Sequence, residues 1–321
     1  MDAGLFRGCL RGCFGVVGAW AVRASASSRE KRAAAALEES QGDVRREVLH
    51  GDALDWLERL GPHGLPPGCC VVTGMPDWSE LKRGRGQDTL DDYRAFLRRA
   101  VRLILGRLPP GSLAVFLQTD VTKGGNWVDK AALVCAEAEA LGATLLWHKI
   151  ILDPESVGIA RRAYTAGYTH ALCFLTQKLQ DASADASTSR RIPSELVSLA
   201  AAALPDVLPR GRKLYAQGMG IDALHAILAW LVALRPPVTQ VVDPFCGRGT
   251  VLAVANAQGL RALGMDIDAA CTRAAARFDV SRLRDTESLR SRAWKRAWSD
   301  RGRAARVERR LSEARALAGG T

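Results

Sequence analysis

The fold is decided by a short segment late in the chain, Val241-Val-Asp-Pro-Phe-Cys-Gly-Arg-Gly-Thr250. Its apolar start predicts a strand that ends in the carboxylate of Asp243, and the apolar pattern from Val251 onward predicts a helix. Between them, Gly247 and Gly249 bracket a tight turn, where the lack of side chains lets the backbone approach a ligand. The turn has no Lys-Ser/Thr pair, so it differs from a phosphate-binding P-loop. The sequence therefore predicts a ligand-binding turn at the carboxyl edge of a parallel sheet.

A second acid ends the next predicted strand, Arg261-Ala-Leu-Gly-Met-Asp266. A carboxylate at this position can accept hydrogen bonds from both hydroxyls of a ribose. The turn does not complete the Gly-x-Gly-x-x-Gly pattern of dinucleotide-binding folds, because Leu252 stands at the third glycine position. Asp243 and Asp266 together predict a cofactor that contains a nucleoside, and an NAD-linked enzyme is the weaker alternative.

Apolar runs of strand length alternate with helical patterns through the body of the chain, which predicts a doubly wound α/β fold. Helical spacing covers residues 91–108, which stop at Pro109-Pro-Gly111, and residues 127–141, which stop at Gly142. Seven strands are expected, at residues 47–50, 69–73, 112–117, 144–151, 170–176, 240–243 and 261–266.

The segment Asp243-Pro-Phe-Cys-Gly-Arg-Gly-Thr250 resembles the cofactor motif of class I S-adenosylmethionine-dependent methyltransferases, in particular the N4-cytosine and N6-adenine amino-methyltransferases of DNA. The order of the other segments matches a permuted group of that family. Gly51-Asp-Ala-Leu-Asp-Trp-Leu57 resembles the turn before the catalytic strand, and Cys69-Cys-Val-Val-Thr-Gly-Met-Pro-Asp-Trp78 resembles that strand and its loop. The resemblance covers about residues 47–280. It implies a Rossmann-like class I methyltransferase fold: a seven-stranded, mostly parallel sheet with permuted motif order.

The resemblance also implies S-adenosyl-L-methionine as cofactor and gives its contacts. Asp243 would meet the methionine amine, Asp266 the ribose, and Asp52 the adenine amino group. A helix that starts near Gly218-Met-Gly220 would place backbone amides at the methionine carboxylate. No metal site is expected. The predicted cofactor-binding residues are Asp52, Thr73, Gly218, Gly220, Asp243, Phe245, Gly247, Gly249, Thr250 and Asp266.

The catalytic loop departs from the family. The DNA methylases have Asp/Asn/Ser-Pro-Pro-aromatic, where the first polar group and a backbone carbonyl hold the target amino group and the aromatic stacks on the flipped base. Here the sequence is Gly74-Met75-Pro76-Asp77, so the polar side chain is lost and an acid replaces the aromatic. Asp77 could be a general base, or it could cap a helix through the box Asp77-Trp-Ser-Glu80. The predicted catalytic residues are Gly74, Pro76, Asp77 and Trp78, with Trp78 as a base-stacking ring.

Cys246 belongs to the cofactor turn and not to the catalytic loop. The sequence from Val71 to Trp78 contains no cysteine, so the cysteine nucleophile of a cytosine-C5 mechanism is missing there. We therefore expect Cys246 to pack in the core or to line the cofactor site.

The positive charge is concentrated at the end of the chain. Of the net charge of +11, residues 281–321 contribute an excess of seven, from twelve Lys/Arg against five Asp/Glu. Such a segment suits a polyanion, so nucleic acid is the expected partner. The segments Trp147-His-Lys149 and Arg161-Arg162-Ala-Tyr164 are further candidates for backbone contacts, although an edge strand and a solvated loop explain them equally well.

The substrate prediction rests on the space left for target recognition. Residues 153–167 and 181–210 are too few for a large DNA-recognition insert. RNA, such as tRNA or rRNA, is therefore the favoured substrate. The alternatives are a DNA N6-adenine or N4-cytosine methyltransferase and a cofactor-binding partner subunit without catalysis.

Three regions are expected: an N-terminal extension (1–40), a methyltransferase domain (41–280) and a basic helical tail (281–321). The extension is rich in Arg and Ser and has one acid before Glu30, which resembles a mitochondrial or chloroplast transit peptide, or an unstructured extension. The eight cysteines show no ligand pattern and indicate a reducing, intracellular compartment. No apolar run reaches the roughly 20 residues of a membrane span. The oligomeric state is left open.

Overall fold

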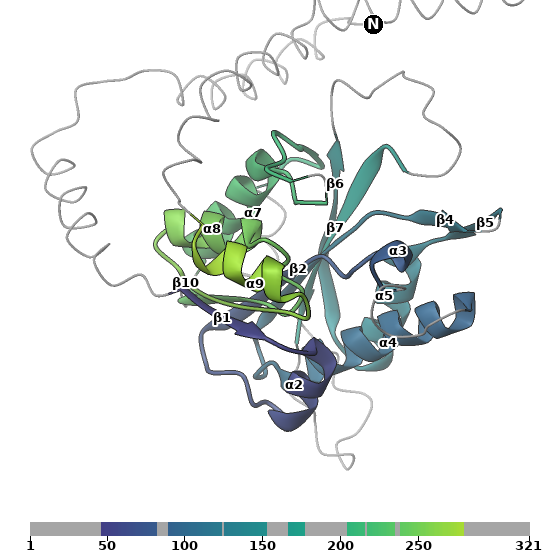
Figure 1. Ribbon diagram of the computed structural model, residues 1–321, viewed down its shortest axis with the longest axis horizontal. Coiled ribbons are helices and arrows are strands. Elements are labelled where there is room, and N and C mark those ends of the chain that lie inside the picture. The colour runs from purple at the N-terminus through teal and green to yellow at the C-terminus, as the bar shows by residue number, and fades with distance from the viewer. Residues whose placement is uncertain are drawn as a thin grey trace, which may run out of the picture. The chain divides into compact units, whose positions relative to one another are not determined.

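The strands that the sequence predicts form one sheet in the computed structural model. The structure describes residues 46–81, 89–123, 125–152, 166–176, 204–215, 217–234 and 238–278. The predicted extension, the basic tail and the segment Arg161–Tyr164 lie outside these residues. The described residues all belong to one compact unit, with helices on both faces of a central sheet (Figure 1).

Eight strands of the described part of the chain form this sheet, and all but one run in the same direction. The exception, β7, is antiparallel to both of its neighbours. In spatial order the strands are β1 (Arg46–His50), β10 (Arg261–Asp266), β9 (Gln240–Asp243), β2 (Cys69–Thr73), β3 (Leu113–Gln118), β7 (Tyr168–Leu175), β6 (Thr144–Leu152) and β8 (Val207–Pro209). The last two strands of the described residues therefore lie between the first two, as the permuted order requires.

The helices form two layers. One face carries α2 (Ala53–Arg59), α3 (Trp78–Leu81), α4 (Leu90–Arg107) and α5 (Lys130–Ala140), and the other carries α7 (Ile221–Ala233), α8 (Thr250–Ala257) and α9 (Ala269–Ala276). The longest, α4, starts with a capping box between Thr89 and Asp92 and ends before Pro109. Because both faces of the sheet are covered, its central strands are buried along their length, as in β3.

Three short strands were not predicted. The short strand β8 pairs with β6, so β6 is an inner strand of the described sheet. A hairpin of β4 (Val121–Lys123) and β5 (Asn126–Val128) extends from the carboxyl end of β3 (Figure 1). The helix expected from residue 127 therefore begins only at Lys130. No helix of the described residues is long and apolar enough to span a bilayer.

Candidate functional site

The candidate site is built where three neighbouring parallel strands end. Because β10, β9 and β2 are adjacent and parallel, their last residues meet at one edge of the sheet. Asp243 ends β9, and its Oδ1 accepts a hydrogen bond from the hydroxyl of Thr73 at 2.6 Å and one from the amide of Phe245 at 3.2 Å. The Asp243 side chain is buried, and this burial raises its pKa to about 7 against the opposing effect of the two donors.

The turn after Asp243 needs both of its glycines. Gly247 and Gly249 have φ angles of 53° and 83°, in the left-handed region that favours glycine. A Cβ on Gly249 would also lie 2.8 Å from the Cβ of Ala275 on α9. Gly249 is the N-cap of α8 and makes no side-chain cap, so the start of α8 keeps backbone amides available to a ligand. As expected, Cys246 packs in the core beside Gly264.

Asp266 is held with its carboxylate in a fixed orientation. Oδ2 accepts from the amide of Gly247 at 2.9 Å, and Oδ1 accepts from the amide of Asp268 at 2.8 Å. Burial raises the pKa of Asp266. The next residue, Ile267, is 53 % exposed and adds an apolar surface beside this carboxylate, which the sequence analysis missed.

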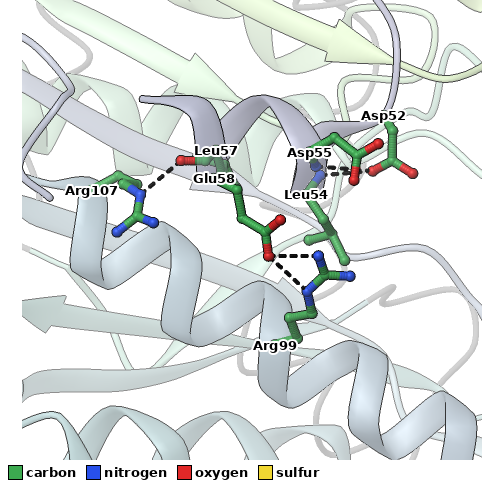
Figure 2. Close-up of polar contacts among 7 residues, drawn as sticks. All are labelled: Asp52, Leu54, Asp55, Leu57, Glu58, Arg99 and Arg107. Carbon is green, nitrogen blue, oxygen red and sulfur yellow. Dashed lines mark hydrogen bonds and ion pairs between the residues drawn. The ribbon is translucent and has the colours of Figure 1, made fainter. Parts of the chain in front are cut away.

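Asp52 lies beside Asp266 and starts a helix. The pairing of β1 with β10 sets His50 opposite Asp266, and the amide of Gly51 donates to the Asp266 carbonyl at 3.0 Å. Oδ1 of Asp52 caps α2 by accepting from the amide of Leu54 at 2.8 Å (Figure 2). The predicted contact to an adenine amino group stays a prediction.

Two contacts, drawn in Figure 2, connect helix α2 to helix α4. Arg99 Nη2 lies 2.6 Å from Glu58 Oε1, and Arg107 Nε donates to the carbonyl of Leu57 at 2.7 Å. The pair between Arg99 and Glu58 is half exposed and stabilises little, whereas the part-buried bond to the backbone fixes the helix. The helix that Asp52 caps is therefore anchored to the longest helix of the same layer.

The segment before α7 approaches the cofactor turn. A Cβ on Gly218 would lie 3.3 Å from Thr250 Oγ1, at the start of α8. Gly220 is the N-cap of α7, and a Cβ there would collide with the carbonyl of Arg210. The predicted helix before the cofactor strand is present, and the two helix starts lie side by side.

The predicted catalytic loop, residues 74–77, joins β2 to α3. A Cβ on Gly74 would collide with Cε of Met219, so this methionine fills the space that a side chain at position 74 would need. The carbonyl of Pro76 accepts from the hydroxyl of Tyr93 at 3.2 Å. Trp78 is 9 % exposed and packs edge to face on Tyr93 with ring centroids 5.5 Å apart. A stacking role for Trp78 stays a prediction, and it would require the ring to leave this core.

Asp77 makes one of the two hydrogen bonds of the predicted capping box, and it also forms an ion pair that was not predicted. Its amide donates to Glu80 Oε2 at 2.7 Å, which is one half of a capping box. Its carboxylate lies 2.8 Å from Lys130 Nζ. No sequence pattern indicated this pair, because Lys130 is 53 residues away and lysine is rarely buried.

In the segment Trp147–Lys149, the side chains of Trp147 and Lys149 are buried and that of His148 is exposed. Trp147 is buried against Trp230 of α7, with ring centroids 5.4 Å apart, and β8 pairs with β6 only from Ile150 to Leu152. Lys149 is also buried and pairs with Asp206 at 2.8 Å. Neither side chain is free to contact a nucleic-acid backbone in this conformation.

Solved structures share this architecture. A proposed DNA modification methylase from Thermus thermophilus matches with a TM-score of 0.50 and 20 % identity, over 76 % of this chain and 97 % of that chain. Its complex with S-adenosyl-L-methionine matches with a TM-score of 0.50 and 19 % identity, over 76 % and 96 % of the two chains. The cytosine-N4-specific PvuII DNA methyltransferase matches with a TM-score of 0.50 and 14 % identity, over 75 % and 90 %. No protein-family model and no curated protein sequence matches the chain.

The sheet, its permuted order and these neighbours define the Rossmann-like class I methyltransferase fold, which confirms the predicted fold class. The seven predicted strands are all present among the described residues, and β8 extends the sheet to eight. At identities of 20 % and below, the likeness concerns the fold. The chemistry must be argued from the residues of this chain.

Proposed function

We propose that this protein is an S-adenosyl-L-methionine-dependent methyltransferase that acts on nucleic acid. The observation that carries the proposal is the placement of Asp243 and Asp266 at adjacent strand ends, with the glycine turn between them. The two carboxylates suit an ammonium and a ribose, the two polar ends of an amino-acid nucleoside.

The residues at this edge fit that cofactor. The two hydrogen-bond donors to Asp243 given above are neutral, so the methionine ammonium would supply a positive charge to a buried carboxylate. The amides at the start of α7 suit the methionine carboxylate, and Ile267 offers an apolar face to the adenine ring. Asp266 retains lone pairs for both ribose hydroxyls, since each oxygen accepts one bond in the structure.

The protein's contribution to the reaction is mainly positioning. The cofactor would supply an activated methyl group, which is transferred by in-line displacement. The chain would hold the acceptor atom roughly 3 to 3.5 Å from the methyl carbon. Loop 74–77 follows directly from Thr73, which contacts the cofactor-binding carboxylate, so the loop is the natural place for the acceptor.

DNA is the first substrate class to test. The neighbours described above are DNA methyltransferases, which favours the DNA alternative over the RNA prediction. The features that favour RNA are the small space for a recognition insert and the basic residues 281–321, which lie outside the described residues. The organellar location likewise stays a prediction.

A cofactor-binding subunit without catalysis is the second candidate. The observation that favours it is the position of the Met219 methyl group, which lies beside Gly74 where amino-methyltransferases have a polar side chain. Such a subunit would bind the cofactor and transfer no methyl group.

The test is the transfer of tritiated methyl from the cofactor to purified DNA and to purified RNA. Incorporation into DNA supports the proposal and incorporation into RNA restores the RNA prediction. The control is the variant Asp266→Ala, which we expect not to bind the cofactor. Cofactor binding without transfer to either polymer, native or denatured, would favour the non-catalytic subunit.

A further inference from the structure

The buried side chain of Lys130 forms an ion pair with the predicted catalytic loop. Lys130 is the first residue of α5, and its side chain is 1 % exposed. Its Nζ lies 2.8 Å from Oδ1 of Asp77, whose side chain is 45 % exposed. The ion pair therefore joins a buried ammonium to a carboxylate that reaches solvent.

The backbone of Lys130 is fixed by its neighbours. Its amide donates to Oδ1 of the buried Asp120 at 2.8 Å, and the other oxygen of Asp120 lies 3.2 Å from Nε2 of His170. The ring of His170 in turn bonds His148 at 2.9 Å. Asp129 adds the cap of α5 by accepting from the amide of Ala132. The side chain of Lys130 thus extends from a backbone that hydrogen bonds hold in place.

The loop is fixed around Asp77 as well. The Tyr93 hydroxyl holds the carbonyl of Pro76, and Glu80 holds the amide of Asp77. Of the four loop residues 74–77, only Asp77 has an ionisable side chain. Because Gly74 has no side chain and Met75 and Pro76 have apolar ones, the polar side chain that the loop offers to a substrate is that of Asp77.

The loop lies within electrostatic reach of the cofactor edge. Burial raises the pKa of Glu80; the charges of Asp77 and Asp266 add to the rise, and that of Lys130 opposes it. The pKa of Glu80, in helix α3 that follows the loop, is therefore affected by the charges of both Lys130 and Asp266, the proposed ribose ligand. The charges of Lys130 and Asp266 thus both reach Glu80, three residues after Asp77.

We propose that Lys130 is a positioning residue, which holds the carboxylate of Asp77 where it accepts a hydrogen bond from the target group of the nucleic acid. Asp77 would thus take over the role of the polar side chain that position 74 lacks. This inference rests on the proposed methyltransferase function and names the group of that same site that meets the substrate.

The first experiment is a thermal-unfolding cycle of Asp77→Asn, Lys130→Met and the double variant. Asp77→Asn leaves a buried ammonium without its carboxylate, whereas Lys130→Met leaves a carboxylate that water can solvate. We expect the melting temperature to fall more for Asp77→Asn than for Lys130→Met and to recover in the double variant. Strictly additive shifts would overturn the pairing.

The second experiment measures kcat for methyl transfer in the same variants, with cofactor affinity measured in parallel. Lys130→Met should lower kcat by about tenfold or more at unchanged cofactor affinity, and should lower it no further in the Asp77→Asn background. The matched control is Lys149→Met, which removes another buried lysine that pairs with an exposed carboxylate at 2.8 Å. The control should keep the wild-type kcat.

The outcomes separate this inference from the function on which it rests. A wild-type protein that transfers no methyl group to any nucleic acid overturns both. An active wild type in which Lys130→Met keeps its kcat overturns only the positioning role. An equal loss of kcat in Lys130→Met and Lys149→Met would also overturn it, because the loss would then reflect any buried lysine.

Discussion

Thr73 donates a hydrogen bond of 2.6 Å to Asp243, which joins the last residue of the predicted catalytic strand to the last residue of the cofactor strand. The two residues lie 170 positions apart in the sequence. The register of β2 against β9 brings them together. The proposed cofactor ligand Asp243 is therefore bonded to the residue that precedes the predicted catalytic loop.

The first prediction concerns this bond. Thr73→Val leaves the buried carboxylate of Asp243 with one donor fewer, which costs about 1 to 3 kcal/mol. Cofactor affinity at neutral pH should fall about tenfold, because the hydroxyl stabilises the ionised form. Calorimetric titration checks this, with Thr73→Ser as the control that keeps the hydroxyl. Equal affinities for the Val and Ser variants would show that the bond is unimportant.

The second prediction concerns pH. Because burial raises the pKa of Asp243 to about 7, cofactor affinity should rise several-fold between about pH 6 and about pH 8, as the carboxylate forms. Asp243 should affect the stability of the cofactor-free protein in the opposite direction. A raised pKa favours the folded state most below about pH 4, and this contribution is lost as the pH rises through about 7.

Calorimetry and thermal unfolding across this pH range test both trends. Asp243→Asn should bind cofactor weakly and lose most of the pH dependence of unfolding. A wild-type affinity that stays flat from about pH 6 to about pH 8 would contradict the assignment of Asp243.

The third prediction separates backbone strain from close approach. Gly249 and Gly259 both have positive φ, at 83° and 77°, but only a Cβ on Gly249 meets another residue. Each Ala substitution should cost about 1 to 3 kcal/mol through strain. Gly249→Ala should cost more and should also abolish cofactor binding, whereas Gly259→Ala should keep it. Denaturant unfolding measures the loss of stability, and cofactor titration measures binding. An equal loss of cofactor binding in the two variants would contradict a specific role of the turn at Gly249.

The fourth prediction concerns the basic tail. Replacement of Arg292, Lys295 and Arg296 by Ala should flatten the salt dependence of nucleic-acid binding by about 2 to 3 in the logarithmic slope and leave cofactor affinity unchanged. The control variant removes three charges from α4: Arg98, Arg99 and Arg102. If both variants shift the slope equally, the effect comes from net charge, and the tail is a solvated segment.

The strands, the turn and the helix from Gln240 to Asp266 could be predicted because their signals are local. Asp243, the two glycines and Asp266 lie within one strand-turn-helix-strand unit, and each strand has an apolar run of clear length. Strand β8 could not be predicted, since three residues that end in proline give no periodicity. The hairpin of β4 and β5 could not be predicted because each strand has only three residues, and the start of α5 was therefore placed too early.

The catalytic side could not be predicted because it depends on distant contacts. A lysine at the start of a helix usually lies in solvent, whereas the side chain of Lys130 is buried and pairs with Asp77, and its backbone amide donates to Asp120. Met219 fills the space beside Gly74 from a segment much later in the sequence. No local pattern encodes either contact.

The most direct test of the central claim is a calorimetric titration of the purified protein with S-adenosyl-L-methionine and, separately, with NAD. We expect one cofactor molecule to bind per chain, no measurable heat with NAD, and loss of cofactor binding in Asp266→Ala. Wild-type protein that binds NAD and not S-adenosyl-L-methionine, or an Asp266→Ala variant with unchanged affinity, would contradict the assignment of this edge as the cofactor site.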